Sequence, residues 1–274
     1  IAYPFFIMQQ TVLVTGASSG LGKSIATHLH TLGYRVFGTS RNPQNYSDFP
    51  FPLLALDISS QASVDLFFAE LHTKTERIDV LVNNAGVGIT GAVEEVNLDA
   101  LRAHFDTNFF GPLAVTQQLL PLMRAGKQGK IINITSIGAS MGLPFRGGYS
   151  ASKGALQIIS EALRMEVAQF GIEVCTLAPG DYATDIASRR YYEPNKKGSP
   201  YEALYQESLA TMDEHVDDGN DPKEIALAVA RLIQKKALKP HYAVGPFMQK
   251  LSLLLKRLLP QKAFERLLKN HYNL

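Results

Sequence analysis

The chain has 274 residues, of which 46% are hydrophobic and 19% charged, and its formal net charge is only +2. This apolar share is ordinary for a globular domain, and the small charge argues against a nucleic-acid-binding face, which requires clustered basic residues. Cys175 is the only cysteine, so an internal disulfide is excluded, no metal site is expected, and a reducing, cytoplasmic setting fits.

The first residues, 1–7, are apolar but lack the basic region and cleavage site of a signal peptide. We expect them to be upstream or added residues, with a natural start at Met8, and we exclude them from the fold. No stretch of the sequence reaches the ~18 uninterrupted apolar residues that a membrane-spanning helix needs.

Apolar segments typical of strands alternate with segments of helical periodicity. Strands are predicted at 11–15, 34–40, 51–57, 78–84, 130–136, 172–178 and 241–245, and helices at 20–32, 60–73, 99–126, 150–170 and 222–236. The strands show no clean apolar–polar alternation, which indicates burial on both faces of a parallel sheet. The sequence therefore predicts one doubly wound α/β domain over 8–246, with a mostly parallel seven-stranded sheet.

The first predicted strand is followed by a glycine-rich segment, TGASSGLG, at 15–22. Glycines there would let the backbone turn sharply and approach a pyrophosphate, which the free N–H groups of the next helix would bind. The alternative is a plain glycine turn.

The second predicted strand ends at Ser40 and Arg41, where many dinucleotide sites carry an acid that binds the ribose hydroxyls. No carboxylate lies between Lys23 and Gln44. Because Ser and Arg bind a phosphate whereas an acid repels it, this pair favours NADP(H). The alternative is that Arg41 is an ordinary solvated charge.

Four motifs in order resemble the short-chain dehydrogenase/reductase family over about residues 10–245. They are T-G-x-x-x-G-x-G at 15–22, N-N-A-G at 83–86, a serine thirteen residues before Tyr-x-x-x-Lys (Ser136, Tyr149, Lys153), and P-G-x-x-x-T at 179–184. The resemblance implies a Rossmann-type NADP-binding fold, and the tail beyond 245 is similar to the hydroxysteroid and retinol dehydrogenase-like branch.

The resemblance also implies residue roles. Asn108, Ser136, Tyr149 and Lys153 would form the catalytic set, with Asn108 steadying a water relay beside the lysine. Asp57 would accept from the adenine amino group, and Thr184 would hold the nicotinamide amide or a phosphate. The expected cofactor contacts are Gly16, Ser18, Ser19, Gly20, Leu21, Gly22, Ser40, Arg41, Asp57, Ile58, Asn84, Ala85, Gly86, Tyr149, Lys153, Pro179, Gly180 and Thr184.

Tyr149 and Lys153 are four residues apart, so they share one face of the predicted helix. A carbonyl that accepts a hydride needs a proton donor, and an alcohol that loses one needs a base. The lysine charge, with an oxidised nicotinamide, favours the phenolate that acts as this base. Without the other motifs, the pair would be interpreted as a surface Tyr/Lys pair.

The favoured function is an NADP(H)-dependent reductase of ketones or aldehydes, reversible as an alcohol dehydrogenase. A cofactor-sensing protein without turnover, and an isomerase or dehydratase that retains its cofactor, are the alternatives. The substrate pocket is expected between the 137–148 loop and a lid at about 186–220. Leu143, Phe145, Tyr191 and Tyr192 there indicate a small, mainly apolar substrate. The resemblance implies a homodimer that pairs through helices 99–126 and 150–170.

Residues 247–274 are leucine-rich and basic, and they depart from the compact pattern of the family. Apolar residues at three- and four-residue steps predict an amphipathic helix at 247–259, a break at Pro260 and a second helix at about 261–271. The favoured interpretation is a helical extension that packs on the domain or covers the substrate cleft. The alternative is a helix that lies on a membrane surface.

Overall fold

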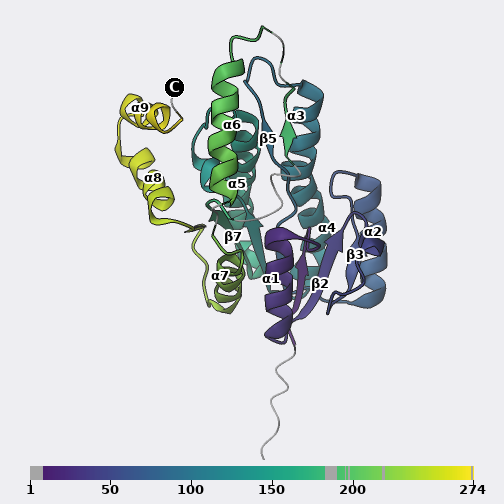
Figure 1. The fold of residues 1–274 in the computed structure, drawn as a ribbon. Coiled ribbons are helices and arrows are strands. Elements are labelled where there is room, and N and C mark those ends of the chain that lie inside the picture. Colours follow the sequence, from purple (N-terminus) through teal and green to yellow (C-terminus); the bar gives the residue numbers. More distant parts are fainter. Residues whose placement is uncertain (1–8, 183–189, 195, 197, 218–219, 273) are drawn as a thin grey trace, which may run out of the picture.

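The computed structural model describes residues 9–182, 190–194, 196, 198–217, 220–272 and 274 (Figure 1). Its central feature is a seven-stranded sheet in the order β3-β2-β1-β4-β6-β7-β9, in which every neighbouring pair is parallel. The predicted doubly wound α/β fold is therefore confirmed. The strands are β1 (Thr11–Val14), β2 (Arg35–Ser40), β3 (Leu53–Ala55), β4 (Val80–Asn83), β6 (Gly129–Ile134), β7 (Ile172–Pro179) and β9 (His241–Val244).

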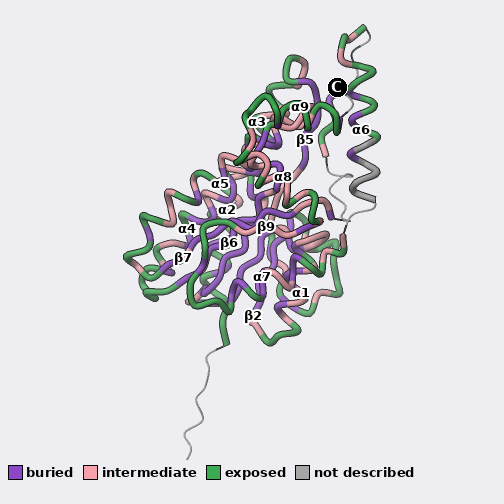
Figure 2. The backbone as a smooth tube through the Cα atoms, turned by 90° about the vertical axis from the view of Figure 1, so that its left-hand side faces the viewer, coloured by how far each residue is buried: buried purple, intermediate pink, exposed green. Residues whose placement is uncertain are grey.

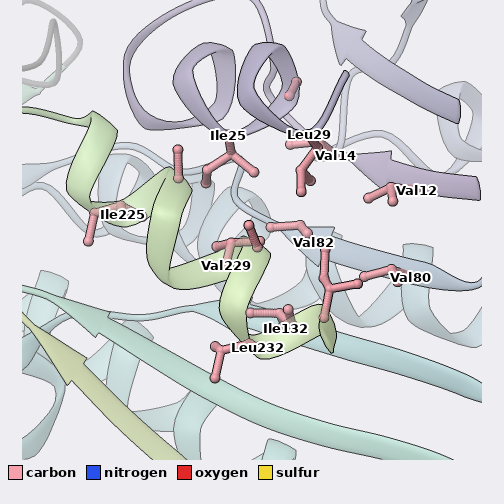
Figure 3. Packing of buried hydrophobic residues seen from close by; sticks show 14 of the residues in the cluster. Val12, Val14, Ile25, Leu29, Val80, Val82, Ile132, Ile225, Val229 and Leu232 are labelled. Atoms are coloured by element: carbon pink, nitrogen blue, oxygen red, sulfur yellow. The ribbon is translucent and has the colours of Figure 1, made fainter. Parts of the chain in front are cut away.

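Helices cover both faces of the sheet. One face carries α1 (Gly20–Thr31) and α7 (Lys223–Gln234), whose side chains pack on β1, β4 and β6 (Figure 3). The other face carries α2 (Gln61–Lys74), α4 (Gly111–Ala125) and α5 (Gly147–Val167). Val12 and Val14 of β1 face the first layer and Leu13 the second, so each strand is apolar on both sides. This explains why the strands show no apolar–polar alternation.

The strand order reverses between β1 and β4, whose carboxyl ends lie side by side. In open α/β sheets, ligands bind in the crevice outside the carboxyl ends of the strands at such a reversal. The chain leaves β1 into the glycine-rich segment before α1, and it leaves β4 into residues 84–88. These two segments therefore border the expected ligand crevice.

The stretch predicted as a helix at 99–126 is helical from Leu98 to Ala125, but a π turn that was not predicted divides it. The chain forms α3 (Leu98–Phe105), a π-helical turn (Asp106–Phe110) and α4. The extra residue of the π turn lets the side chain of Asn108 point inward, where its amide bonds both backbone groups of Val87. The helix predicted at 150–170 begins earlier, and its last residues form a 3-10 turn (Ala168–Phe170).

Part of the region expected as a lid contains regular structure that the sequence did not predict. A short strand, β8 (Tyr191–Tyr192), pairs with β5 (Ile89–Thr90), and α6 spans Glu202–Asp217. The Tyr205 ring of α6 packs 5.5 Å from that of Phe145, centroid to centroid, and its hydroxyl lies 2.9 Å from Thr90 Oγ1. These contacts hold α6 against the loop before α5. Two further 3-10 turns span Pro43–Asn45 and Ile137–Ser140.

The C-terminal segment forms the two predicted helices, α8 (Phe247–Leu258) and α9 (Gln261–His271), on either side of Pro260. They lie along one side of the molecule next to α5, as Figure 1 shows. Phe264 is buried against Ile137, Met141 and Ala178, and Leu253 and Leu255 pack on the same cluster. In the part of the chain that the structure describes, no helix is long and apolar enough to cross a membrane.

Candidate active site

A single cavity of about 800 Å³ extends from the glycine-rich segment to the C-terminal helices. Every expected cofactor contact that lies among the described residues lines this cavity. Thr184 and the segment 1–7 lie outside the described residues. The cavity is large enough for a dinucleotide's nicotinamide end and an apolar ligand, in the size range of ordinary ligand pockets.

The glycines of the first turn are required by the backbone. Gly16 and Gly20 have φ angles of +65° and +53°, in the left-handed region. A Cβ at Gly22 would lie 2.2 Å from the carbonyl oxygen of Gly16. The first turn of α1 has no acidic residue, so its free N–H groups and dipole are available to an anion.

Thr15, which the sequence did not single out beyond its motif, ties this turn to the end of β4. Its hydroxyl oxygen accepts hydrogen bonds from the backbone N–H groups of Asn84 and Ala85, each at 3.0 Å. The Asn84 side-chain amide donates in return to the carbonyl oxygens of Thr15 and Gly16, at 2.9 and 3.2 Å. The two segments that border the crevice are therefore held together before any ligand binds.

Ser40 is the last residue of β2 and Arg41 follows it, and both line the cavity. Ser40 is buried and its hydroxyl accepts from the N–H of Asn42, whereas Arg41 is exposed. The Asp57 carboxylate binds its own neighbour Ser59, through the hydroxyl at 2.6 Å and the backbone N–H at 3.0 Å. Asp57 therefore lines the cavity with a carboxylate that is already hydrogen-bonded, and Arg41 lines it with an exposed basic side chain.

Tyr149 and Lys153 are both buried in the first turns of α5 and both line the cavity. The Lys153 ammonium donates to the carbonyl oxygen of Ile134 at 3.0 Å, and no described carboxylate pairs with it. Because burial penalises the charged form, the pKa of Lys153 is lowered to about 8. The lysine can therefore release and regain a proton close to neutral pH.

Ser136 and Arg146 complete the surroundings of Tyr149. Ser136 caps the Ile137–Ser140 turn, where its hydroxyl oxygen accepts from the N–H of Gly138 at 3.1 Å, and it lines the cavity. The guanidinium carbon of Arg146 lies 5.0 Å from the centroid of the Tyr149 ring. Arg146 was not predicted, and a charge over an aromatic face leaves no pattern in the sequence.

Asn108 is fully buried and does not line the cavity itself. Its amide oxygen accepts from the Val87 N–H at 2.9 Å, and its Nδ2 donates to the Val87 carbonyl oxygen at 3.0 Å. A Cβ at Gly86 would lie 3.2 Å from both Asn108 Oδ1 and Lys153 Nζ. Asn108 thus lies next to the lysine, as its expected role requires.

The sequence analysis missed His104, which is buried between Asn108 and α5. Its Nε2 lies 3.0 Å from Asn108 Nδ2 and 3.0 Å from the hydroxyl of Ser152. Burial, followed by the nearby Lys153 charge, lowers the pKa of His104 to about 4. His104 is therefore neutral at physiological pH, and its Nδ1 has no hydrogen-bond partner among the described residues.

The opposite end of the cavity is mostly apolar and is covered by the C-terminal helices. Of the four residues predicted to line the substrate pocket, Leu143 does so, whereas Phe145, Tyr191 and Tyr192 do not. Phe145 packs on Tyr205 instead, and the two tyrosines are taken up by the short β5–β8 sheet. The apolar lining comes from other residues of the 137–148 loop, the expected lid and the C-terminal helices: Met141, Met212, Met248, Leu255, Phe264, Leu267 and Leu268.

The first turn of α8 is fastened to the segment after β7. Gln249 Nε2 donates to the Asp181 carboxylate at 2.6 Å, and Gln249 Oε1 accepts from the Asp181 N–H at 3.0 Å. A Cβ at Gly180 would lie 2.0 Å from Gln249 Oε1, so a larger residue there would displace the Gln249 side chain. The C-terminal helices that cover the apolar end are therefore attached directly to a segment that is expected to contact the cofactor.

Comparison with known proteins gives consistent relatives. Residues 10–194 match the family model described as short chain dehydrogenase. The chain is 37% identical to the 3-ketodihydrosphingosine reductase of Bacteroides thetaiotaomicron, over 96% of this chain and 98% of that protein. It is 34% identical to the NADPH-dependent 3-dehydrocapnine reductase of Ornithobacterium rhinotracheale, over 85% and 87%. A crystal structure of a short-chain dehydrogenase from Streptomyces avermitilis is 31% identical, covers 97% of this chain and 96% of its own, and superposes with a TM-score of 0.80.

Proposed function

Because the chain belongs to the short-chain dehydrogenase/reductase family, we propose that it is an NADP(H)-dependent oxidoreductase that interconverts a ketone or aldehyde and an alcohol. One observation carries the proposal. A single cavity has a turn suited to a pyrophosphate at one end, Ser136, Tyr149 and Lys153 in the middle, and apolar helices at the other end. This arrangement would place a dinucleotide, a proton donor and an apolar ligand next to one another in the same cavity.

The residues of the first turn fit a dinucleotide, because they line the cavity and the first turn of α1 offers free N–H groups with no acidic residue. Ser40 and Arg41 would hold a 2′-phosphate, and an acid in their place would repel it. The relative from Ornithobacterium is named as NADPH-dependent, which supports the same cofactor. When bound, the nicotinamide supplies or accepts the hydride.

The protein's own residues transfer the proton. In the direction of reduction, the Tyr149 hydroxyl donates its proton to the carbonyl oxygen, and the Ser136 hydroxyl holds the same oxygen by a hydrogen bond. Lys153, with its pKa lowered to about 8, returns a proton toward Tyr149. Asn108 fixes the backbone beside the lysine through Val87. In the direction of oxidation the same steps run in reverse.

For the substrate, we propose a ketone carried on a long alkyl chain. Beyond Tyr149 the C-terminal helices wall the cavity with apolar surface from Met248, Leu255, Phe264 and Leu268. The same helices add the polar side chains of Gln249, Ser252 and His271. The relative named 3-ketodihydrosphingosine reductase, which matches the chain almost end to end, supports a ketone of this kind.

The test is NADPH oxidation with a panel of ketones that differ only in alkyl chain length, including 3-ketodihydrosphingosine, with Tyr149→Phe as the control. We expect kcat/KM to rise with chain length and the control to be inactive. NADPH binding without turnover of any ketone would favour the sensor. Turnover that consumes no net NADPH would favour an isomerase or dehydratase.

We also propose a homodimer that pairs through α4 and α5, in a reducing, cytoplasmic compartment. The large side chains of Phe110, Ile158 and Met165, at or on these helices, are more than half exposed, which supports an interface there. The single thiol, Cys175, is buried, and burial raises its pKa to about 12, so it is unreactive. Light scattering of the full chain and of Ile158→Glu tests the dimer, and an unchanged mass would contradict it.

A further inference from the structure

Helix α8 has two apolar faces, of which the domain covers only one. Leu253 and Leu255 pack on the cluster around Phe264. Phe247, Leu254 and Leu258 are 72%, 50% and 68% exposed. Their spacing of seven and four residues places them on one face, which runs the length of the helix. This outer stripe of Phe247, Leu254 and Leu258 has no partner among the described residues.

Basic residues surround the outer stripe. Residues 247–274 contain six Lys and Arg against one Glu, so the rest of the chain has more acidic than basic residues, 24 against 21. The net positive charge of the protein therefore comes from this one segment. Lys250 and Arg257 lie beside the stripe on α8, and Lys262 and Arg266 lie on α9; all four are exposed and none is in an ion pair among the described residues.

The cavity reaches the same side of the molecule. Met248 and Leu267 line the cavity, yet they are 69% and 46% exposed. Helix α8 therefore lines the cavity with Met248 and carries the outer stripe of Phe247, Leu254 and Leu258 as well. Figure 2 shows this side facing the viewer, with α8 and α9 over the upper part of the domain.

We propose that the outer surface of α8 and α9 binds an anionic lipid bilayer, with Phe247, Leu254 and Leu258 in the acyl boundary and the basic residues at the headgroups. An apolar stripe flanked by Lys and Arg has the chemistry of an interfacial helix. On the proposed function, α8 and α9 then lie between the cavity and a bilayer in which a long-chain ketone is dissolved. The helices do not cross the bilayer, and their inner face stays packed on the domain.

Vesicle flotation of the full chain tests the proposal without substrate or cofactor. The vesicles are phosphatidylcholine alone, or phosphatidylcholine and phosphatidylglycerol in equal parts. We expect binding to the anionic vesicles that weakens as salt is raised, and little binding to phosphatidylcholine alone. Because no turnover is measured, failure of the proposed function would leave this result unaffected.

Two variants separate the apolar and the charged contributions. Leu254→Gln/Leu258→Gln should weaken vesicle binding at least about tenfold by removing inserted side chains. Its matched control is Leu66→Gln/Leu98→Gln, which changes exposed leucines on α2 and α3. Lys250→Glu/Arg257→Glu should also weaken binding at least about tenfold. Its matched control is Lys236→Glu/Lys239→Glu, on the loop before β9, whereas α8 follows the other end of that strand.

Absence of binding to anionic vesicles at low salt would overturn the proposal, as would equal losses in the variants and their controls. Light scattering tests whether another copy of the chain binds the outer stripe instead. If the wild type forms an assembly larger than a dimer that Leu254→Gln/Leu258→Gln disperses, the stripe is covered by another copy of the chain and the proposal is wrong. Circular dichroism of each variant confirms that α8 and α9 still form.

Discussion

The Nε2 of His104 lies 3.0 Å from the amide nitrogen of Asn108, four residues further along the chain. The amide orientation is fixed, because Asn108 Oδ1 accepts from the Val87 N–H and Nδ2 donates to the Val87 carbonyl oxygen. An amide nitrogen can only donate, so His104 Nε2 accepts in its bond to Asn108. The Ser152 hydroxyl, also 3.0 Å from this nitrogen, donates to the Tyr149 carbonyl oxygen. We therefore expect His104 to be a positioning residue for Asn108.

Replacing His104 tests this role. His104→Leu removes the acceptor and leaves a buried amide N–H with fewer partners, so the free energy of unfolding should fall by about 1–3 kcal/mol. His104→Gln keeps an acceptor oxygen and should recover part of that loss. Chemical denaturation measures the free energy of unfolding of both variants. The pH profile of kcat shows whether the active site changes as well. Equal losses in the two variants would mean that His104 only fills space.

The lowered pKa of His104 predicts how stability depends on pH. The unfolded chain protonates this histidine near its ordinary pKa of 6.5, whereas the folded chain does so only near 4. Between these values the unfolded state binds more protons, so stability is full above about pH 6.5 and falls as the pH falls toward 4. The loss should reach about 3 kcal/mol. Denaturation midpoints at several pH values measure it, and the dependence should be weaker in His104→Gln.

The proton-donor role of Tyr149 is tested by Tyr149→Phe, which deletes only the hydroxyl. Because general acid catalysis contributes about 10²–10⁴-fold, kcat should fall at least about 100-fold while the NADPH dissociation constant stays nearly unchanged. Lys153→Met should raise that constant and lower kcat together, because the lysine is assigned to both cofactor and proton transfer. Substantial ketone turnover by Tyr149→Phe would refute the assignment.

Arg41 is expected to set the cofactor preference. Arg41→Ala removes one charge-assisted contact to the 2′-phosphate, worth about 1.5–3 kcal/mol, so NADPH should bind at least about tenfold more weakly. NADH lacks that phosphate and serves as the internal control, with little change. Dissociation constants from fluorescence titration give both numbers. Tighter binding of NADH than of NADPH by the wild type would contradict the preference.

Gln249 is expected to affect long substrates selectively. Gln249→Ala breaks both hydrogen bonds to Asp181 and releases the first turn of α8 from the segment after β7. We expect KM to rise for a long-chain ketone and to change little for a short one, since only the long chain contacts α8 and α9. Gln261→Ala, whose exposed side chain accepts from Lys256, is the matched control. A uniform loss of kcat on all ketones would show that the fastening serves the cofactor side instead.

Elements that depend on local pattern were predictable from the sequence. The strands, the turn at Gly16 and Gly22, and the break at Pro260 each follow from residues close together in the chain. Contacts between polar residues that are far apart in the chain could not be predicted in this way. Gln249 meets Asp181 across 68 positions, and nothing in either neighbourhood indicates the pairing. Helix α6 was missed because its sequence, EALYQESLATMDEHVD, is polar on most of its surface.

The π turn at Asp106–Phe110 has a consequence for which changes the protein tolerates. One inserted residue advances a helix by about 100° in phase, since an α-helix has 3.6 residues per turn. α3 presents His104 to α5, while α4 presents Val115 and Leu119 to the sheet, and the inserted residue sets the angle between the two. A one-residue deletion within 106–110 would rotate one helix face away from its partner. No side-chain substitution can restore that phase, so this stretch should be more sensitive to a change in length than to a change in composition.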